Sequence, residues 1–432
     1  MIQIKTLENG IRLVVEEIPS VRSVSLGIFV KTGSAEEDPK YEGISHFIEH
    51  MLFKGSENFS AKEIVRTIDR TGGEINAYTG KEATCYYVRS LDETWKTAAD
   101  VLCDMISHPL FQKEDLDRER QVILEEIRMD EDSPEDVAHE HFMEMVFENS
   151  PYASSITGSA SSLRRITSPV IRRYHASHYT KNRIVVSCAG KITMEEAEAF
   201  FSGKFADLSA GESRAEGDVS EKTSGARSSV TDPAKQRIRQ TERDIRQAQL
   251  CLGKRVIPLT DPRSYALQIV NGLFGASDSS RLFQEIREEQ GLAYAAYSEL
   301  GFFSSEAYFE IYAGVRPDHL IQTFSAIQNE IRRLQEEPIL DEELETARME
   351  LKADYVFSGE SPNARMNANG KNLLLYGKVF QPEEVLHGFE RVTKEDAESV
   401  KEQIGDLSQY SLSIVSDRRI DRRKFIENAF DQ

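Results

Sequence analysis

The sequence contains no long apolar run. No stretch approaches the roughly 20 consecutive apolar residues that a membrane-spanning helix requires. The chain begins with a strand-like segment and a turn signal at Asn9-Gly10, rather than with the charged and apolar regions of a secretory signal. We therefore expect no membrane partner and a cytoplasmic location.

Cysteine and basic residues are also scarce. The four cysteines are scattered and form no C-x-x-C pair, which is typical of buried free thiols in a reducing compartment. Only 53 Lys and Arg oppose 73 Asp and Glu, so the formal net charge is −20. This excess disfavours nucleic acids and anionic membranes as partners, and it suits a cavity that attracts basic peptides. Neither a G-x-S-x-G elbow nor a phosphate-cradling glycine pattern is present.

Two histidines and a glutamate form the most informative motif. His46, Glu49 and His50 lie in the segment 41–54, whose apolar periodicity predicts a helix. Residues four apart lie one turn above each other on one helix face, so the two imidazoles can share one metal ion. Glu49 leans toward the same site, where its carboxylate can take a proton from water. The order H-x-x-E-H is the inverzincin signature.

A catalytic zinc site also needs a third protein ligand and an open position for water. A second helix is predicted at 113–130, charged on one side and apolar on the other. Glu119 and Glu126 share a face of this helix, since seven residues are close to two turns. Glu125 is a neighbouring candidate, but it points about 100° away around the helix. The alternative is that these acids only form a solvated face.

Two further histidine pairs are interpreted as structural. His139 and His141 face different sides of a predicted helix, which favours surface or boundary histidines over the alternative that one of them binds a metal weakly. His175 and His178 have a possible ligand spacing, but the tyrosines that flank them indicate a packed helix end.

Strand-like and helix-like segments alternate through both halves of the chain. The predicted strands are 24–30, 74–79, 84–90, 184–188, 247–253, 293–299, 307–313 and 410–415, and the further predicted helices are 61–70, 93–106, 168–178, 261–274, 279–290, 317–336 and 341–356. Ser133-Pro134 also marks a helix start. We predict an α+β protein of two similar halves, each a mixed or antiparallel sheet with helices on one face.

An internal repeat supports the division into two halves. The run E-D-L-D-R-E-R that begins at Glu114 resembles E-E-L-E-T-A-R at Glu342, an offset of 228 (342 − 114). This offset places Phe274 opposite His46, so the second half keeps the scaffold and lacks the histidines. The polar segment 211–238 is interpreted as a linker between the domains 1–210 and 239–432.

Together these motifs resemble the pitrilysin/insulinase family of zinc peptidases, most closely the mitochondrial processing peptidase subunits and their bacterial relatives. In that branch the third ligand is a Glu about 76 residues after the second His, which from His50 is Glu126 (126 − 50 = 76). A supporting Glu two turns earlier matches Glu119. The resemblance implies that His46, His50 and Glu126 bind Zn²⁺, with Glu49 as the general base.

The resemblance extends beyond the metal ligands. The run G-G-E-I-N-A-Y-T is similar to the family's edge strand beside the zinc, which implies that substrate pairs as an added strand near Asn76, Ala77 and Tyr78. Taken alone, this run predicts an ordinary turn into a strand. Arg287 and Tyr294 hold the seven-residue spacing of the family's Arg and Tyr pair, and the resemblance implies that they assist catalysis.

The resemblance also implies an assembly. Each half is expected to contain two ferredoxin-like modules, and two chains are expected to pair as a clamshell homodimer. We predict a zinc endopeptidase that hydrolyses unfolded peptides or presequence-like segments, with 1–210 as the catalytic domain and 239–432 as an inactive repeat that contributes substrate-binding residues. Two alternatives stay open: a non-catalytic assembly subunit, and an enzyme that requires an inactive partner chain.

Overall fold

The computed structural model describes residues 2–211 and 238–421 of the chain. The predicted linker, 211–238, falls almost entirely outside these ranges. The described residues form two compact units, of which unit 1 comprises 2–127, 154–211 and 357–381, and unit 2 comprises 128–153, 238–356 and 382–421. Each unit therefore includes one segment from the other half of the sequence.

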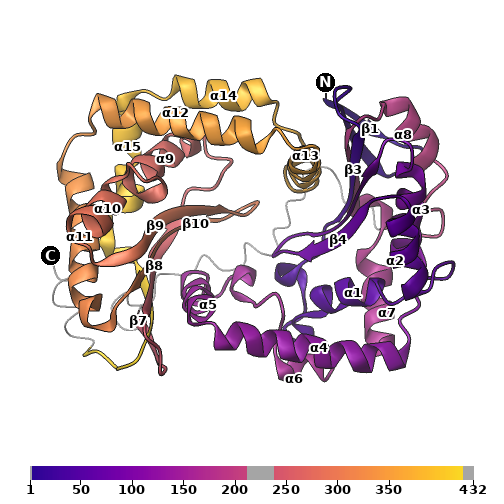
Figure 1. Cartoon of the computed structure of the whole chain (residues 1–432), viewed down its shortest axis with the longest axis horizontal. Helices are drawn as coiled ribbons and strands as arrows, with labels where there is room; N and C mark the ends of the chain where they lie inside the picture. The colour runs from indigo at the N-terminus through magenta and orange to yellow at the C-terminus, as the bar shows by residue number, and fades with distance from the viewer. Residues whose placement is uncertain (1, 212–237, 422–432) are drawn as a thin grey trace. The chain divides into compact units, whose positions relative to one another are not determined.

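Unit 1 is built on a six-stranded sheet (Figure 1). In spatial order the strands are β1 (Ile2–Thr6), β2 (Arg12–Glu17), β6 (Ile184–Gly190), β3 (Ser23–Val30), β5 (Thr84–Leu91) and β4 (Glu74–Thr79). β2 and β6 are parallel, and the other neighbouring pairs are antiparallel. Gly10 turns the β1–β2 hairpin with a φ of +88°, which glycine adopts without strain. Among the described strands, only β5 pairs with β4, so β4 has a free edge.

Helices cover one face of this sheet. They are α1 (Ile44–Leu52), α2 (Ala61–Arg70), α3 (Trp95–Ser107), α4 (Lys113–Asp132), α6 (Ala160–Leu163), α7 (Ser168–His178) and α8 (Met194–Phe201). Phe47 and Ile48 of α1 are fully buried against a core that includes Leu26 and Ile28 of β3. The apolar side of α1 is thus fixed on the sheet, which determines where its polar residues lie.

A helix from the far end of the sequence covers the opposite face. α13 (Pro362–Tyr376) buries Met366 and Leu373 in a small apolar layer with Phe29 of β3. A Cβ at Gly370 would lie only 2.1 Å from the Phe29 ring, so this close approach requires glycine. The sequence did not predict this helix or its place in unit 1.

Unit 2 repeats the sheet of unit 1 without its first strand. The order is β7 (Ile238–Glu242), β11 (Ser411–Ser416), β8 (Ala248–Val256), β10 (Ala307–Val315) and β9 (Ala293–Phe302). β7 and β11 are parallel, and the remaining pairs are antiparallel. This is the order and direction of β2, β6, β3, β5 and β4, so the predicted α+β fold of two similar halves is confirmed.

The helices of unit 2 follow the same plan. One layer consists of α9 (Ser264–Asn271), α10 (Arg281–Phe283), α11 (Leu320–Glu336), α12 (Asp341–Ser358), α14 (Pro382–Arg391) and α15 (Lys394–Gly405). π-helical turns follow α9 at Gly272–Ala276 and α10 at Gln284–Glu289, so the helices predicted at 261–274 and 279–290 are only partly α-helical. The other sheet face is covered by α5 (Pro134–Val146), from the first half of the sequence. The two units therefore exchange one helix each.

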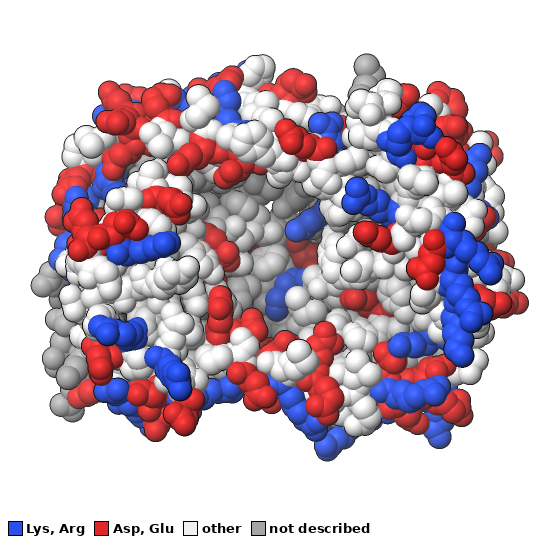
Figure 2. Space-filling model, in the orientation of Figure 1, with Lys and Arg blue, Asp and Glu red and all other residues white. Residues whose placement is uncertain are grey.

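Acidic side chains are spread over the surface of both units. On the face drawn in Figure 2 they gather over α12 and α14, and they mix with basic side chains along α4. This distribution agrees with the net charge of −20. Among the described helices, none is long and apolar enough to cross a membrane.

Candidate metal centre

The start of α1 is held by a buried acid. Glu37 accepts hydrogen bonds from the backbone N–H groups of Gly43, at 2.6 Å, and Ser45, at 2.7 Å. A carboxylate here satisfies free N–H groups and interacts favourably with the helix dipole. Burial raises the pKa of Glu37 to about 7, although these hydrogen bonds lower it in part. Sequence reasoning missed Glu37 because it lies well before the helix, outside the usual N-cap pattern.

The three predicted metal ligands converge at α1 and α4. The rings of His46 and His50 stand edge to face, 4.7 Å apart between centroids. Glu126 Oε2 lies 3.7 Å from His46 Nε2 and 3.5 Å from His50 Nε2. Ligand atoms that share one tetrahedral zinc ion at about 2.0–2.2 Å are about 3.4 Å apart from each other. The two distances to Glu126 therefore match a single ion.

The environment of these groups also fits a cation. Within the described residues, His46 Nδ1 and Glu126 Oε2 are buried without a hydrogen-bond partner. A buried carboxylate oxygen without a partner is costly, and a cation removes that cost. Burial, with a contribution from His50, lowers the pKa of His46 to about 4, so this imidazole is neutral near neutral pH. Neutral imidazole is the form that binds metal.

Glu119 supports the site from α4. Its Oε2 lies 3.3 Å from His50 Nδ1, and its Oε1 lies 2.7 Å from Lys54 Nζ. A proton on Nδ1 that is shared with this carboxylate leaves Nε2 of His50 free to bind a metal. Glu125, the neighbouring candidate, is exposed to solvent. The face of α4 that contacts α1 therefore carries Glu126 and not Glu125.

Glu49 lies beside the ligands and is held by the end of β4. Thr79 Oγ1 donates a hydrogen bond of 2.5 Å to Glu49 Oε2. Burial raises the pKa of Glu49, while the Thr79 hydrogen bond and His50 lower it in part. Such a carboxylate is suited to accept a proton and to return it. Sequence reasoning did not single out Thr79, because its contact with Glu49 depends on how β4 packs beside α1.

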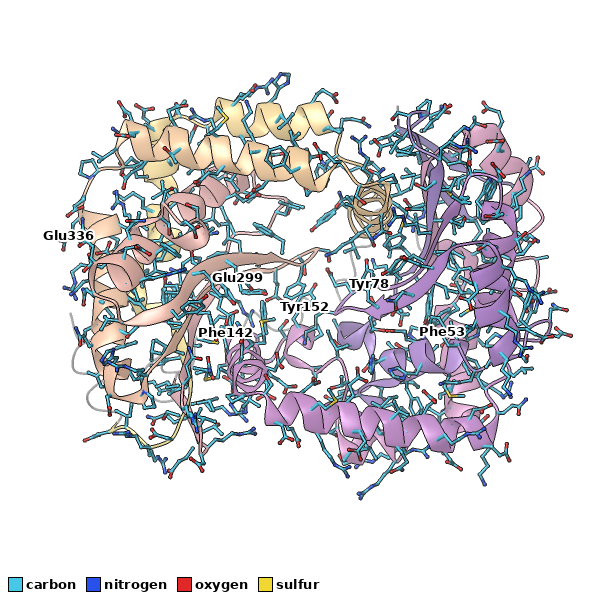
Figure 3. The ribbon with its side chains drawn as sticks, viewed as in Figure 1. Phe53, Tyr78, Phe142, Tyr152, Glu299 and Glu336 are labelled. Atoms are coloured by element: carbon cyan, nitrogen blue, oxygen red, sulfur yellow. The ribbon has the colours of Figure 1, made fainter. Side chains whose placement is uncertain are left out.

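The free edge of β4 carries the predicted substrate-binding residues. Asn76 and Tyr78 are exposed and Ala77 is half-buried, in the alternation expected of an edge strand. Tyr78, which Figure 3 labels on β4, donates a hydrogen bond of 2.9 Å to Asn367 Oδ1 of α13. The unpaired backbone of this strand is able to pair with an extended peptide. That pairing stays a prediction.

Arg287 and Tyr294 contact each other in unit 2. The guanidinium of Arg287 lies 5.1 Å from the ring centre of Tyr294 and 4.7 Å from that of Phe283, at cation–π distance. Tyr294 is 81% exposed, so its hydroxyl is available to a ligand. Because the pair belongs to unit 2, its action on substrate at His46 and His50 stays a prediction.

The interpretation of His175 and His178 as a packed helix end is confirmed. His175 is buried, with Nε2 2.9 Å from the backbone oxygen of Ile106. Each ring also stacks on a neighbouring tyrosine, His175 on Tyr179 and His178 on Tyr174. The four cysteines are free and buried, as predicted.

Solved structures share this two-unit α+β architecture. The chain aligns with the crystal structure of a peptidase M16 inactive domain from Pseudomonas fluorescens at a TM-score of 0.86 and 20% identity, over 97% of this chain and 99% of that one. It aligns with a protease from Helicobacter pylori at a TM-score of 0.85 and 21% identity, over 96% and 99%. At these identities the likeness concerns the fold.

Sequence comparisons give the family. The model described as "Insulinase (Peptidase family M16)" matches residues 12–160, and "Peptidase M16 inactive domain" matches 165–351. The uncharacterized zinc protease YmxG of Bacillus subtilis (strain 168) is 36% identical, over 96% of this chain and 98% of the relative. The uncharacterized zinc protease SCO5738 of Streptomyces coelicolor is also 36% identical, over 91% and 85%. The chain belongs to the insulinase family of peptidases, M16.

Proposed function

We propose that this chain is a zinc-dependent endopeptidase whose metal ligands and general base lie in unit 1. The observation that carries the proposal is the convergence of His46, His50 and Glu126, with Glu49 beside them on α1. The names of the curated relatives, zinc proteases, support it. The match of 165–351 to a model of an inactive domain agrees with a second half that lacks the histidine pair.

Each residue of the site has a distinct task. His46, His50 and Glu126 hold Zn²⁺, which supplies a Lewis acid that polarises a carbonyl and makes water more acidic. Glu49 accepts the proton of the attacking water and delivers it to the leaving amine. Glu119 orients the imidazole of His50. Arg287 and Tyr294 of unit 2 assist at the substrate.

The substrate is an extended peptide that pairs with the free edge of β4. Backbone hydrogen bonds along this edge supply affinity without requiring a particular sequence, which suits unfolded or presequence-like segments. The net charge of −20 favours basic peptides by long-range attraction. We propose that the active form is a homodimer in the cytoplasm, and assay of the purified chain alone tests whether an inactive partner chain is required.

Substitution of Glu49 by Gln tests the mechanism. The variant should bind as much zinc as the unaltered chain, because Glu49 is not a ligand. Its turnover of a mixed pool of unfolded peptides should fall by about 10²- to 10⁴-fold, the usual contribution of a general base. The products are measured by mass spectrometry, with and without a chelator, and zinc is measured on the same samples. The matched control is Glu125→Gln, an exposed acid on α4.

Each result decides a separate point. Full activity of Glu49→Gln would remove the general-base role from this residue. Loss of zinc in the same variant would contradict the ligand assignment. A purified chain that carries no zinc and cleaves no peptide would establish the non-catalytic alternative.

A further inference from the structure

A second cluster of metal-binding side chains lies in unit 2. His139 of α5, Cys251 of β8 and Glu310 of β10 place one ligand atom each within 4.8 Å of one another. The closest pair is His139 Nδ1 and Glu310 Oε1, at 2.7 Å. Among the described residues, the only other such group is His46, His50 and Glu126.

The sheet and one helix bring these groups together. Cys251 pairs with Tyr312 across β8 and β10, and Glu310 lies two residues before Tyr312, so both ligand side chains point to the same face. Gly253, the partner of Glu310, lets the two strands approach closely, since a Cβ there would lie 1.9 Å from the backbone oxygen of Phe309. α5 packs on this face (Figure 3, where Phe142 marks α5 and Glu299 marks β9). The His139 ring stacks on Tyr312 with 5.3 Å between centroids, which holds the imidazole over the sheet.

Burial and charge favour a cation at this place. Cys251 is fully buried and Glu310 is 1% exposed. Glu310 Oε1 lies 2.7 Å from His139 Nδ1, and a buried carboxylate requires a positively charged neighbour, which a bound cation would supply. Glu299 and Glu135 add further negative charge near His139, so the surroundings of the cluster favour a cation.

We propose that His139, Cys251 and Glu310 form a second metal site, which binds a zinc-class divalent ion and ties α5 to the sheet of unit 2. Thiolate and imidazole ligands select such ions over calcium or magnesium, which prefer oxygen ligands. When the ion binds, the Cys251 thiol releases its proton to solvent and coordinates as the thiolate. A thiolate and a carboxylate then balance the double charge of the ion. The His139 ring, with 27% of its side chain exposed, gives the ion access from solvent.

Cobalt binding by the full chain tests this site without relying on peptidase activity. The metal-free protein is titrated with Co²⁺ and should bind about two ions per chain, one at each group. A cobalt–thiolate bond gives near-ultraviolet charge-transfer absorption, and only the second site contains a cysteine. Cys251→Ser should abolish the absorption and reduce binding to about one ion. Cys188→Ser is the matched control, a fully buried strand cysteine that should change neither readout.

The same titration separates this proposal from the proposed function. His46→Ala should remove the other ion and leave the charge-transfer absorption intact. If Cys251→Ser does not fold, His139→Gln replaces it, because His139 is partly exposed, and this variant should bind the second ion at least about 10-fold more weakly. Unaltered protein without charge-transfer absorption would overturn the site and establish a metal-free buried ion pair. Absorption that survives Cys251→Ser, or unchanged affinity in His139→Gln, would overturn it as well.

Discussion

The two units share a sheet order but place their candidate metal-binding groups on opposite faces. In unit 1, the candidate metal ligands lie on α1 and α4, in the main helix layer, and α13 covers the other face with an apolar layer beside which Glu16 pairs with Arg365 and Asn369. In unit 2, the first helix after the matching strand is α9, and it and the turn that follows bury Leu267, Val270 and Phe274. Its polar cluster of His139, Cys251 and Glu310 lies instead under the exchanged helix α5.

The comparison shows that this fold tolerates a polar group on either face of the sheet, provided that the buried group has a hydrogen-bonding or charged partner. In unit 1 the compensation is visible as Glu37 at the helix start, Glu119 at His50 and Thr79 at Glu49. The scaffold therefore does not determine the chemistry. A few side chains on neighbouring elements determine it.

The largest effect is expected from His46→Phe. Phe274 is the residue that the internal repeat aligns with His46, so this variant gives unit 1 the residue type found in unit 2. Zinc binding at unit 1 should be lost, and peptide hydrolysis should fall by more than about 10³-fold, since even one stabilising group at a transition state is worth about 10²- to 10³-fold. The reciprocal variant, Phe274→His, should gain neither zinc nor activity. Metal analysis and peptide turnover measure both. Hydrolysis that persists in His46→Phe would show that α1 does not carry the catalytic metal.

The next effect concerns the edge strand β4. Thr79→Val removes the hydrogen bond to Glu49 while it conserves the shape of the side chain. We expect kcat to fall by about 10- to 100-fold, the scale of a lost supporting contact at a metal site. KM and zinc content should change little, because Thr79 positions the base and binds neither zinc nor substrate. Thr79→Ser keeps the hydroxyl and should recover most of kcat, whereas equal losses in both variants would indicate a packing role.

The exchanged helices provide a test of stability. Gly370→Val adds a side chain at a position where even a Cβ would lie 2.1 Å from the Phe29 ring. Such overpacking should lower the free energy of unfolding by about 1–3 kcal/mol in a denaturant titration. Gly203→Val is the control, because a Cβ at that glycine meets no atom within 4 Å. Equal stability of the two variants would mean that α13 is not packed on unit 1 in solution.

The smallest effect is a change in pH dependence at the start of α1. Burial raises the pKa of Glu37 from 4.5 to about 7 on folding. The contribution of Glu37 to the free energy of unfolding is therefore complete below the pKa of the unfolded chain and is lost as the pH rises through about 7, the pKa in the folded chain. Between the two pKa values the loss is at most about 1.4 kcal/mol per pH unit. Glu37→Gln should reduce this slope in unfolding curves, and the exposed control Glu8→Gln should not.

Local patterns in the sequence predicted many elements closely. The helices at 61–70 and 168–178 and the strand at 74–79 are found at these residues as α2, α7 and β4. Their periodicity and their capping or turn residues lie within the element itself, so neighbouring residues suffice to recognise them. The strand predicted at 410–415 is found as β11, but α13, α14 and α15 were not predicted, although α13 begins at Ser361-Pro362 and α15 at a capping box of Thr393 and Asp396.

The sequence by itself determined the fold class and the spacing that places His46, Glu49 and His50 on one helix face, because helix geometry follows from local residues. Only the tertiary structure decided that α4 brings Glu126 within 4 Å of those imidazoles, that Thr79 holds Glu49, and that α5 and α13 are exchanged between the units. These contacts join residues that are far apart in the chain, and their formation depends on which buried faces fit together. No local pattern encodes that fit.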